Sequence, residues 1–195
     1  MKAIEQFDLS NIKHNSAEYI QLLTEIERRA FADRSDLMGD PDFMKLPVYE
    51  FMDKDYIQER MSNFSWDIAT PSSVVKPGEL VFNESDETTH FSIIDDKGNA
   101  VSVTTTLNNS FGSKVFVEES GFFLNNEMDD FSSKPGFPNF FGVIGSEANS
   151  IKPNKRMLSA MTPTIVLSNE KPFLILGSPG GPSIITSVFQ TILNV

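Results

Sequence analysis

The chain has 195 residues, of which 39% are hydrophobic and 17 are phenylalanine, a length and composition that predict a packed globular protein of one or two domains. Its formal net charge of −11 argues against nucleic acid and anionic membranes as partners. The absence of cysteine excludes disulfide bonds and thiol catalysis.

The two histidines, His14 and His90, have no partners at the spacing of metal ligands. We therefore expect no metal site and no cofactor. No apolar run of the sequence approaches the roughly 18 residues that are needed to cross a bilayer.

The first regular element expected is a helix over residues 16–32. Asn15 is followed three residues later by Glu18, a pattern that resembles a capping box with Asn in place of Ser or Thr. A second, shorter helix is predicted to run from a cap at Asp53 through Met61. The apolar residues of the first helix keep the i, i+3, i+4, i+7, i+11 spacing of one helical face: Tyr19, Leu22, Leu23, Ile26 and Ala30.

Two segments that carry aspartates, residues 31–35 and 39–43, lie at and after the end of the first predicted helix. Their carboxylates suggest a calcium site, but the regular ligand spacing of a calcium loop is absent. Turn and capping roles are therefore favoured. Further along the chain, residues 69–87 contain Pro71 and Pro77 and end in acidic side chains, which is typical of an exposed connector.

A hairpin is predicted after the connector, because residues 91–94 and 100–107 have strand character and residues 95–99 have turn character. Thr88 stands directly before it. A Thr hydroxyl becomes a good nucleophile when a base removes its proton, and an α-amine on the same residue, which titrates near ~7.7–8.0, is such a base. From the residues alone, however, a Thr-Thr-His sequence is an ordinary start for a strand.

The Thr-Thr-His sequence at residues 88–90 resembles the start of the catalytic subunit in the gamma-glutamyltranspeptidases. This resemblance implies that a precursor cuts itself at the bond between Glu87 and Thr88, and that the freed Thr88 is the nucleophile. By the same match, residues 1–87 are the C-terminal part of the large-subunit region with its connector, and residues 88–195 are the N-terminal part of the catalytic small-subunit region. We therefore expect a fragment of a precursor whose large and small subunits are partners.

The resemblance extends over residues 125–131 and 153–164. It implies that Thr106 hydrogen-bonds to Thr88 and orients it. It also implies a set of residues that bind the glutamyl end of the substrate: Asn108, Glu127, Asp130 and Ser159. Of these, Glu127 and Asp130 would hold the substrate ammonium, for which a carboxylate offers opposite charge and hydrogen-bond acceptors.

Three neighbouring features are interpreted less directly. Asp129 is expected to be structural, and Lys155 and Arg156 are either anion clamps or structural residues. Ala160 stands where the family typically has a second Ser, which weakens the expected pocket for the substrate carboxylate. Residues 133–142 resemble the loop that covers the site in bacterial relatives, and the Phe at 141 lacks the hydroxyl of the frequent Tyr, so a looser lid is expected.

Two short strands are predicted over residues 164–168 and 172–176, followed by glycines and an apolar helix. Glycines ahead of a helix place unpaired N–H groups at its positive end, although this pattern alone is a weak signal. The resemblance implies that Gly180 and Gly181 supply the oxyanion hole. Pro182 departs from the family's usual polar residue but suits a first helical position.

Taken together, the resemblance implies an α+β fold of the N-terminal-nucleophile hydrolase type, an αββα four-layer sandwich that is present only in part. The implied activity is that of a gamma-glutamyltransferase and glutathione hydrolase. Its donors are glutathione and other gamma-glutamyl compounds, and its acceptors are water, amino acids or peptides. The family also implies a periplasmic or secreted location.

Two other functions stay open. A related acylase of the same superfamily would keep Thr88 and the glycines but does not need the ammonium site of Glu127 and Asp130, which favours gamma-glutamyl donors. The second is a non-catalytic fragment or a binding module that kept the motifs without the activity. For this chain alone we expect an intact bond between Glu87 and Thr88 and no activity, because strands and an Arg from outside the sequence complete the family's site. An unpaired sheet edge should also favour self-association.

Overall fold

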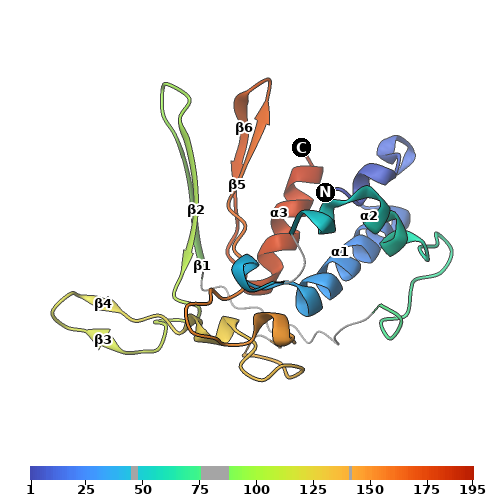
Figure 1. The fold of residues 1–195 in the computed structure, drawn as a ribbon. Coiled ribbons are helices and arrows are strands. Elements are labelled where there is room, and N and C mark those ends of the chain that lie inside the picture. The colour runs from blue at the N-terminus through green and yellow to red at the C-terminus, as the bar shows by residue number, and fades with distance from the viewer. Residues whose placement is uncertain (45–47, 76–87, 141) are drawn as a thin grey trace.

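The computed structural model describes residues 1–44, 48–75, 88–140 and 142–195 (Figure 1). Over these residues the chain is mixed α and β, as predicted. Helices α1 (Ala17–Leu37) and α2 (Lys54–Met61) come first, and α3 (Ile184–Leu193) comes last. Between α2 and α3 lie antiparallel hairpins, which pair β1 (Thr88–Ile94) with β2 (Ala100–Thr106), β3 (Phe116–Val117) with β4 (Phe122–Phe123), and β5 (Thr164–Ser168) with β6 (Lys171–Leu176).

Helix α1 begins close to its predicted start, but the capping residue differs. Ser16 is the N-cap, and its Oγ accepts a hydrogen bond from the backbone N–H of Tyr19 at 3.2 Å. The prediction that Asn15 caps the helix was therefore wrong. Asn15 has a φ of 59°, a turn conformation that Asn tolerates better than most residues.

The end of α1 lies beyond the predicted end at Ala32. The helix continues to Leu37, because its sequence contains no Gly or Pro before Gly39. The turn predicted over residues 31–35 was therefore wrong, and this segment is helical. Helix α2 begins after Asp53, as predicted, because the Asp53 carboxylate accepts hydrogen bonds from two backbone N–H groups of the first turn.

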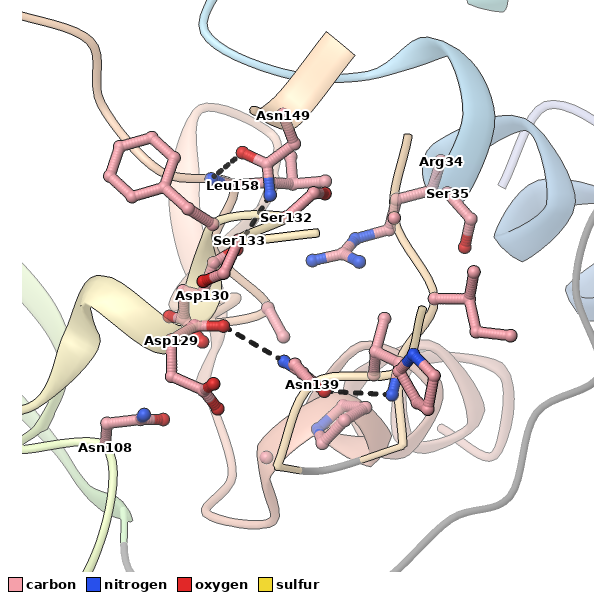
Figure 2. Close-up of a pocket in the computed structure, with 18 of the residues that line it drawn as sticks. Arg34, Ser35, Asn108, Asp129, Asp130, Ser132, Ser133, Asn139, Asn149 and Leu158 are labelled. Atoms are coloured by element: carbon pink, nitrogen blue, oxygen red, sulfur yellow. Dashed lines mark hydrogen bonds between the residues drawn. The ribbon is translucent and has the colours of Figure 1, made fainter. Parts of the chain in front are cut away.

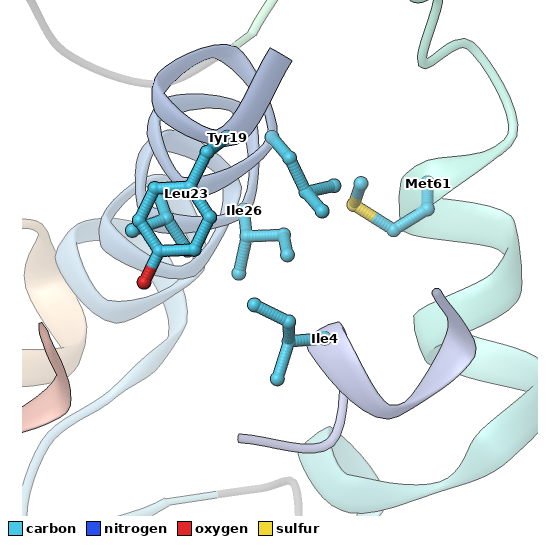
Figure 3. Close-up of a cluster of buried hydrophobic side chains, with 6 residues drawn as sticks. Ile4, Tyr19, Leu23, Ile26 and Met61 are labelled. Atoms are coloured by element: carbon cyan, nitrogen blue, oxygen red, sulfur yellow. The ribbon is translucent and has the colours of Figure 1, made fainter. Parts of the chain in front are cut away.

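The hydrophobic core lies among the helices. Figure 3 shows it between α1, α2 and the N-terminal turn that carries Ile4. Phe189 and Leu193 of α3 pack against it from the C-terminal end of the chain. Ala30, predicted on the buried face, is exposed. The buried members of the core cluster are Ile4, Tyr19, Leu22, Leu23, Ile26 and Met61.

Two charged residues share this buried face of α1. Glu25 and Arg29 form an ion pair in which both side chains are almost completely buried. Arg29 also donates hydrogen bonds to the Asn63 Oδ1 at 2.6 Å and the Thr70 Oγ1 at 3.2 Å. Glu25 accepts one from the Thr70 N–H at 2.9 Å. Thr70 is therefore buried, although it belongs to the predicted exposed connector, most of which (76–87) lies outside the described residues.

The predicted hairpins β1–β2 and β5–β6 both form. The register of β1–β2 pairs Thr88 with Thr106 at its open end. At the closed end, within residues 95–99, Asp95 Oδ1 accepts a hydrogen bond from the Asn99 N–H at 2.8 Å, which fixes the turn. The nucleophile candidate thus lies directly across the ladder from its expected partner.

Figure 1 shows β1–β2 and β5–β6 side by side. Ser92 Oγ donates a hydrogen bond to the Ile175 carbonyl at 3.0 Å, and Ser102 Oγ donates one to the Leu176 carbonyl at 3.0 Å. The hairpins are therefore joined by side-chain hydroxyls rather than by a continuous ladder. Several apolar side chains of β1–β2 are exposed, namely Phe91, Ile93, Ile94 and Val101.

Residues 36–42, at the end of α1, contact residues 146–156, and we call this contact the seam. Asp40 has a fully buried side chain and accepts hydrogen bonds from Arg156 through the backbone N–H at 2.8 Å and Nε at 3.1 Å. The Arg156 guanidinium holds the pKa of Asp40 well below its usual range. Ser146 Oγ donates a hydrogen bond to the Asp36 carbonyl at 2.6 Å. The seam joins the two predicted subunit regions.

Two further contacts bear on predictions about the seam. Asp40 also caps the 3-10 helix Pro41–Phe43, so the capping role predicted for this segment is confirmed. Lys155 Nζ donates hydrogen bonds to two backbone carbonyls, of Ala148 at 2.7 Å and Ser150 at 2.9 Å. Lys155 and Arg156 therefore both make structural contacts, which agrees with the second of the two interpretations left open.

Candidate active site

A cavity of about 170 Å³ lies where α1, β1–β2, the loops between β4 and β5, and the start of α3 meet. Its lining includes five of the residues singled out from the sequence: Thr88, Thr106, Asn108, Asp130 and Gly181. Figure 2 shows Asn108 and Asp130 on one side of it and Arg34 on the other. The cavity therefore brings together residues from both predicted subunit regions.

The open end of β1–β2 supplies the two threonines. Thr88 is half-buried, and Thr106 lies opposite it in the ladder. Thr106 Oγ1 accepts a hydrogen bond from the Asn108 N–H at 3.0 Å, which turns the chain out of the strand. Glu87, the other half of the predicted cleavage site, lies outside the described residues.

Asn108 is buried, with a φ of 75°, a left-handed conformation that Asn adopts more readily than most residues. Its Nδ2 donates a hydrogen bond to the Asn126 carbonyl at 3.2 Å, and Asn126 Oδ1 in turn accepts one from the Asn109 N–H at 3.1 Å. These reciprocal contacts fix the end of β2 against the segment that leads to Asp130.

Asp130 ends a 3-10 helix, Glu127–Asp130, and lines the cavity. Burial, reinforced by the charges of Glu127 and Asp129, raises the pKa of Asp130 to about 6, whereas Arg34 lowers it. Burial also lowers the pKa of Arg34, and the charge of Asp130 opposes that shift. The two groups therefore form a partly desolvated pair of opposite charges across the cavity.

Arg34 is a charged lining residue that the sequence interpretation missed. It was assigned to a turn over residues 31–35, whereas it lies on the last turns of α1 and points toward the cavity (Figure 2). A signal was present, because no Gly or Pro separates Arg34 from the predicted helix, so the helix could have been extended over it.

Asp129 supports the adjoining loop. Its Oδ2 accepts a hydrogen bond from the Phe140 N–H at 3.1 Å, and its carbonyl accepts one from the Asn139 Nδ2 at 3.3 Å. These contacts agree with the structural role expected for Asp129. Phe137 and Asn139 line the cavity, as a covering loop would, but Phe141 lies outside the described residues.

Three predicted site residues are not part of the cavity lining within the described residues: Glu127, Ser159 and Gly180. Ser159 is exposed, and its Oγ accepts a hydrogen bond from the Met161 N–H at 3.1 Å. Glu127 lies one helical turn from Asp130, and burial raises its pKa. The neighbours of Ser159 in the chain, Ala160 and Met161, do line the cavity.

The glycines before α3 have backbones that other residues rarely adopt. Gly180 has a φ of 126° and Gly181 a φ of 51°, and Pro182 occupies the first turn of the 3-10 helix Gly181–Ser183. Earlier in the same loop, a Cβ on Gly177 would stand 2.2 Å from the ring of His90. The loop that carries Gly181 therefore lies directly against the strand that carries the nucleophile candidate.

Among the described residues, no group of three or more His, Cys, Asp or Glu side chains is arranged to hold a metal ion. In the same part of the chain, no helix is long and apolar enough to cross a membrane.

A family model described as gamma-glutamyltranspeptidase matches residues 1–195. The chain is 52% identical over 188 residues to the glutathione hydrolase proenzyme of Pseudomonas aeruginosa, covering 96% of this chain and 33% of that protein. It is 47% identical over 194 residues to the glutathione hydrolase proenzyme of Escherichia coli K12, covering 100% of this chain and 33% of that protein. The chain thus spans about a third of the length of the curated relatives it matches.

Among solved structures, the gamma-glutamyltranspeptidase from Pseudomonas nitroreducens complexed with L-DON is 62% identical, with a TM-score of 0.54 over 55% of each chain. A more distant relative, the acylase ACY 1 proenzyme of Pseudomonas sp. strain SE83, is 33% identical over 195 residues, which cover 100% of this chain and 32% of that protein. The resemblance identified from the sequence is confirmed by these matches.

Proposed function

The chain belongs to the gamma-glutamyltranspeptidase family, and we propose that at the length of its relatives the protein is a gamma-glutamyltransferase and glutathione hydrolase. Its donors are glutathione and related gamma-glutamyl compounds, and its acceptors are water, amino acids or peptides. The observation that carries the proposal is the cavity that Thr88, Thr106, Asn108, Asp130 and Gly181 line together.

The proposed reaction is acyl transfer through Thr88. Its Oγ1 attacks the carbonyl carbon of the gamma-glutamyl amide and gives its proton to the α-amine that cleavage of the bond to Glu87 frees. That proton passes to the departing amine as the C–N bond breaks. Water or an acceptor amine then attacks the ester carbonyl, and Thr88 regains its proton. Self-cleavage comes before this reaction: the Thr88 hydroxyl attacks the Glu87 carbonyl, the peptide C–N bond breaks as an ester forms, and water hydrolyses the ester to give two subunits and a free α-amine on Thr88. The proenzyme names of the relatives support this step.

Other residues position the reacting groups in this proposal. Thr106 orients Thr88 across the ladder, which is supported by their direct pairing in the register. Gly180 and Gly181 donate backbone N–H groups to the oxyanion, and loss of one such donor costs about 2.7–4 kcal/mol in other enzymes. The position of Gly181 in the cavity lining beside Thr88 supports this role.

The glutamyl end of the donor is bound by four residues in this proposal: Asn108, Glu127, Asp130 and Ser159. Asp130 accepts hydrogen bonds from the substrate ammonium, and Arg34 balances its charge while the site is empty. Glu127 and Ser159 reach the substrate only after a local shift, because neither lines the cavity of the empty site.

The wider architecture follows the same family. We propose a four-layer αββα sandwich in which residues 1–87 belong to the large subunit and residues 88–195 to the small one. The likeness to a solved gamma-glutamyltranspeptidase supports this arrangement. A periplasmic or secreted location is proposed from family membership alone.

Hydrolysis of a chromogenic gamma-glutamyl anilide tests the proposal, in a version of the protein extended to the length of its relatives. Thr88→Ala should remain a single chain on a denaturing gel and lose at least about 10³-fold in kcat, whereas Thr88→Ser should retain both reactions in part. Thr89→Ala is the matched control, because successive strand residues face opposite sides and Thr89 is exposed. Normal subunits or normal turnover in Thr88→Ala would contradict the assignment.

An acylase acting on another amide is the second candidate, because an acylase proenzyme is among the relatives at 33% identity. The two functions differ in their need for the substrate ammonium. Donors without the α-amino group should react poorly with a gamma-glutamyl enzyme and equally well with an acylase that does not use Asp130. The same anilide assay, repeated with a glutaryl anilide, distinguishes the two.

A further inference from the structure

Asn149 occupies a position between two walls of the cavity. It is the last residue of a short 3-10 helix, Glu147–Asn149, and it is 5% exposed. The helix is fixed at its start, because Ser146 Oγ accepts a hydrogen bond from the Ala148 N–H at 3.1 Å and donates one to the Asp36 carbonyl at 2.6 Å. The start of the helix that carries Asn149 is therefore anchored to the end of α1, independently of the walls that Asn149 contacts.

The side-chain amide of Asn149 forms one hydrogen bond to each wall (Figure 2). Its Nδ2 donates to the Asp130 carbonyl at 2.7 Å, and its Oδ1 accepts from the Leu158 N–H at 3.0 Å. Its backbone carbonyl accepts a third bond, from the Ser132 N–H at 2.9 Å. The orientation of the amide is determined by these partners, because a carbonyl can only accept and an N–H can only donate.

These bonds link the two ends of the expected substrate site. On one side, the backbone of Asp130 carries the carboxyl expected to hold the substrate ammonium. On the other, Leu158 leads directly into Ala160 and Met161, which line the cavity where the substrate carboxylate is expected. The contacts of Asp129 and of Asp40 each fix only one of these two segments.

We propose that Asn149 is a positioning residue for donor binding, whose amide sets the separation between Asp130 and the wall formed by residues 158–161. This inference rests on the proposed function, since it assigns these two walls to the two charged ends of a gamma-glutamyl group. Asn149 does not touch the reacting atoms in this role. It acts through the backbone of the residues that contact the substrate.

Two substitutions of Asn149 distinguish the hydrogen bond to the Asp130 carbonyl from the one to the Leu158 N–H. Asn149→Asp keeps an acceptor for the Leu158 N–H but cannot donate to the Asp130 carbonyl, and it adds a negative charge to the group formed by Asp129, Asp130 and Glu127. Asn149→Ala removes both bonds. Asn63→Ala is the matched control, because the Asn63 side-chain carbonyl accepts a bond from Arg29 away from the cavity.

Steady-state kinetics at the length of the relatives give the first test. Asn149→Ala should raise KM for the gamma-glutamyl anilide about tenfold while kcat stays within about threefold, since a ground-state contact is weakened. Asp130→Asn and Asn149→Ala together should raise KM little more than Asp130→Asn alone, because the two act through one contact. The proposal would be overturned if the KM increases of the two single variants multiplied in the double variant. A similar KM increase in Asn63→Ala would overturn it as well.

A second readout does not depend on turnover. The Asp130 carboxyl, followed by carbon-13 NMR, is expected to titrate near pH 6 in the unsubstituted protein. Asn149→Ala should lower its midpoint toward the ordinary value near ~3.9, because the released segment admits water, and Asn149→Asp should raise it. If the Asp130 midpoints of the unsubstituted protein, Asn149→Ala and Asn149→Asp all lay within about 0.3 of a pH unit, the positioning role would be overturned. This holds even for a protein that does not hydrolyse the anilide. Absence of hydrolysis alone would overturn only the proposed function.

Discussion

The helical region, residues 1–75 together with helix α3, and the strand region, residues 88–176, are stabilised in different ways. In the helical region, apolar side chains of α1 and α2 pack into one cluster that closes around Leu22. In the strand region, long hairpins keep their shape through ladder hydrogen bonds and leave large side chains such as Phe91 and Phe116 exposed. Burial thus stabilises the first region, whereas polar contacts determine the geometry of the second.

This difference matters because the cavity lies at the junction of the two regions. The helical region supplies Arg34 from the end of a well-packed helix, and the strand region supplies the threonines and Asp130. A catalytic site needs its groups to be fixed in place, and in the strand region that precision depends on a few hydrogen bonds rather than on a core. Four predictions test this contrast.

The largest loss of stability should follow from a polar change inside the helical region. Arg29→Ala removes the buried partner of Glu25 and leaves only the partly exposed Arg28 beside it, and breaking such a buried pair costs about 4 kcal/mol. Urea unfolding can be followed through Trp66, the single Trp of the chain, which packs edge-on against Phe64. Arg28→Ala is the control, because Arg28 contacts the same carboxylate at 3.2 Å but is 25% exposed, and about 1 kcal/mol is expected. Equal losses of stability in Arg29→Ala and Arg28→Ala would mean that the Glu25–Arg29 pair is not buried in solution.

The next effect contrasts apolar residues of the two regions. Leu22→Ala should cost about 3 kcal/mol, because Leu22 is fully buried in the core, whereas Ile93→Ala should cost about 0.5 kcal/mol or less, because Ile93 is 56% exposed. The same unfolding measurement gives both values. A large cost for Ile93→Ala would show that the β1–β2 surface is covered in the protein, which would remove the contrast.

The third prediction concerns the pH dependence of donor binding in the cavity, where the two regions meet. Asp130 must be ionised to hold an ammonium, and burial raises its pKa to about 6. KM for gamma-glutamyl donors should therefore fall about tenfold between pH 5 and pH 7. Arg34→Met should move this midpoint upward, because Arg34 lowers the pKa of Asp130. An unchanged midpoint in Arg34→Met would contradict the coupling across the cavity.

The pH dependence that Asp130 gives to the stability of the fold has the opposite sign to the pH dependence that it gives to donor binding. The pKa of Asp130 in the folded protein lies above its ordinary value of about 3.9, so between about pH 4 and pH 6 the folded state binds more protons than the unfolded state. Its contribution to stability is therefore complete at low pH and is lost as pH rises through about 6. A stability that rose through this window in the unsubstituted protein, but not in Asp130→Asn, would contradict the assignment.

The smallest effect is expected at the seam. Ser146→Ala removes one hydrogen bond to the Asp36 carbonyl and the cap of a short helix, and about 1 kcal/mol is expected. Ser150→Ala is the control, since within the described residues Ser150 Oγ donates to the nearby Glu147 carbonyl and makes no hydrogen bond to the end of α1. If Ser146→Ala changed donor KM as strongly as Asn149→Ala, the position of Asn149 would depend on the seam more than on its own amide.

Local patterns predicted the hairpins and the capped start of α2, because turn residues and caps act over a few positions. They misjudged the end of α1, where the segment 31–35 was assigned to a turn although no Gly or Pro precedes Gly39. They also missed Arg29, because a periodicity argument places apolar residues on the buried face and says nothing of charged ones.

Local sequence patterns could not predict contacts between segments that are distant in the chain. The pairing of Asp40 with Arg156 and the bridge made by Asn149 join residues whose proximity depends on the whole fold. The site residues themselves came from a family resemblance, and the cavity brings five of them together. Their chemical roles stay predictions until the substitutions are made.

The seam acquires a new significance if the bond between Glu87 and Thr88 is cut as proposed. In the uncut chain, its two sides are tethered, so they meet at an effective concentration in about the millimolar range whatever the dilution of the protein. Cutting releases that tether and turns the seam into part of a bimolecular interface governed by mass action. The Asp40–Arg156 pair has an Arg side chain that is 66% exposed, so dissolved salt can screen it. Maturation would thus make the junction sensitive to dilution and ionic strength.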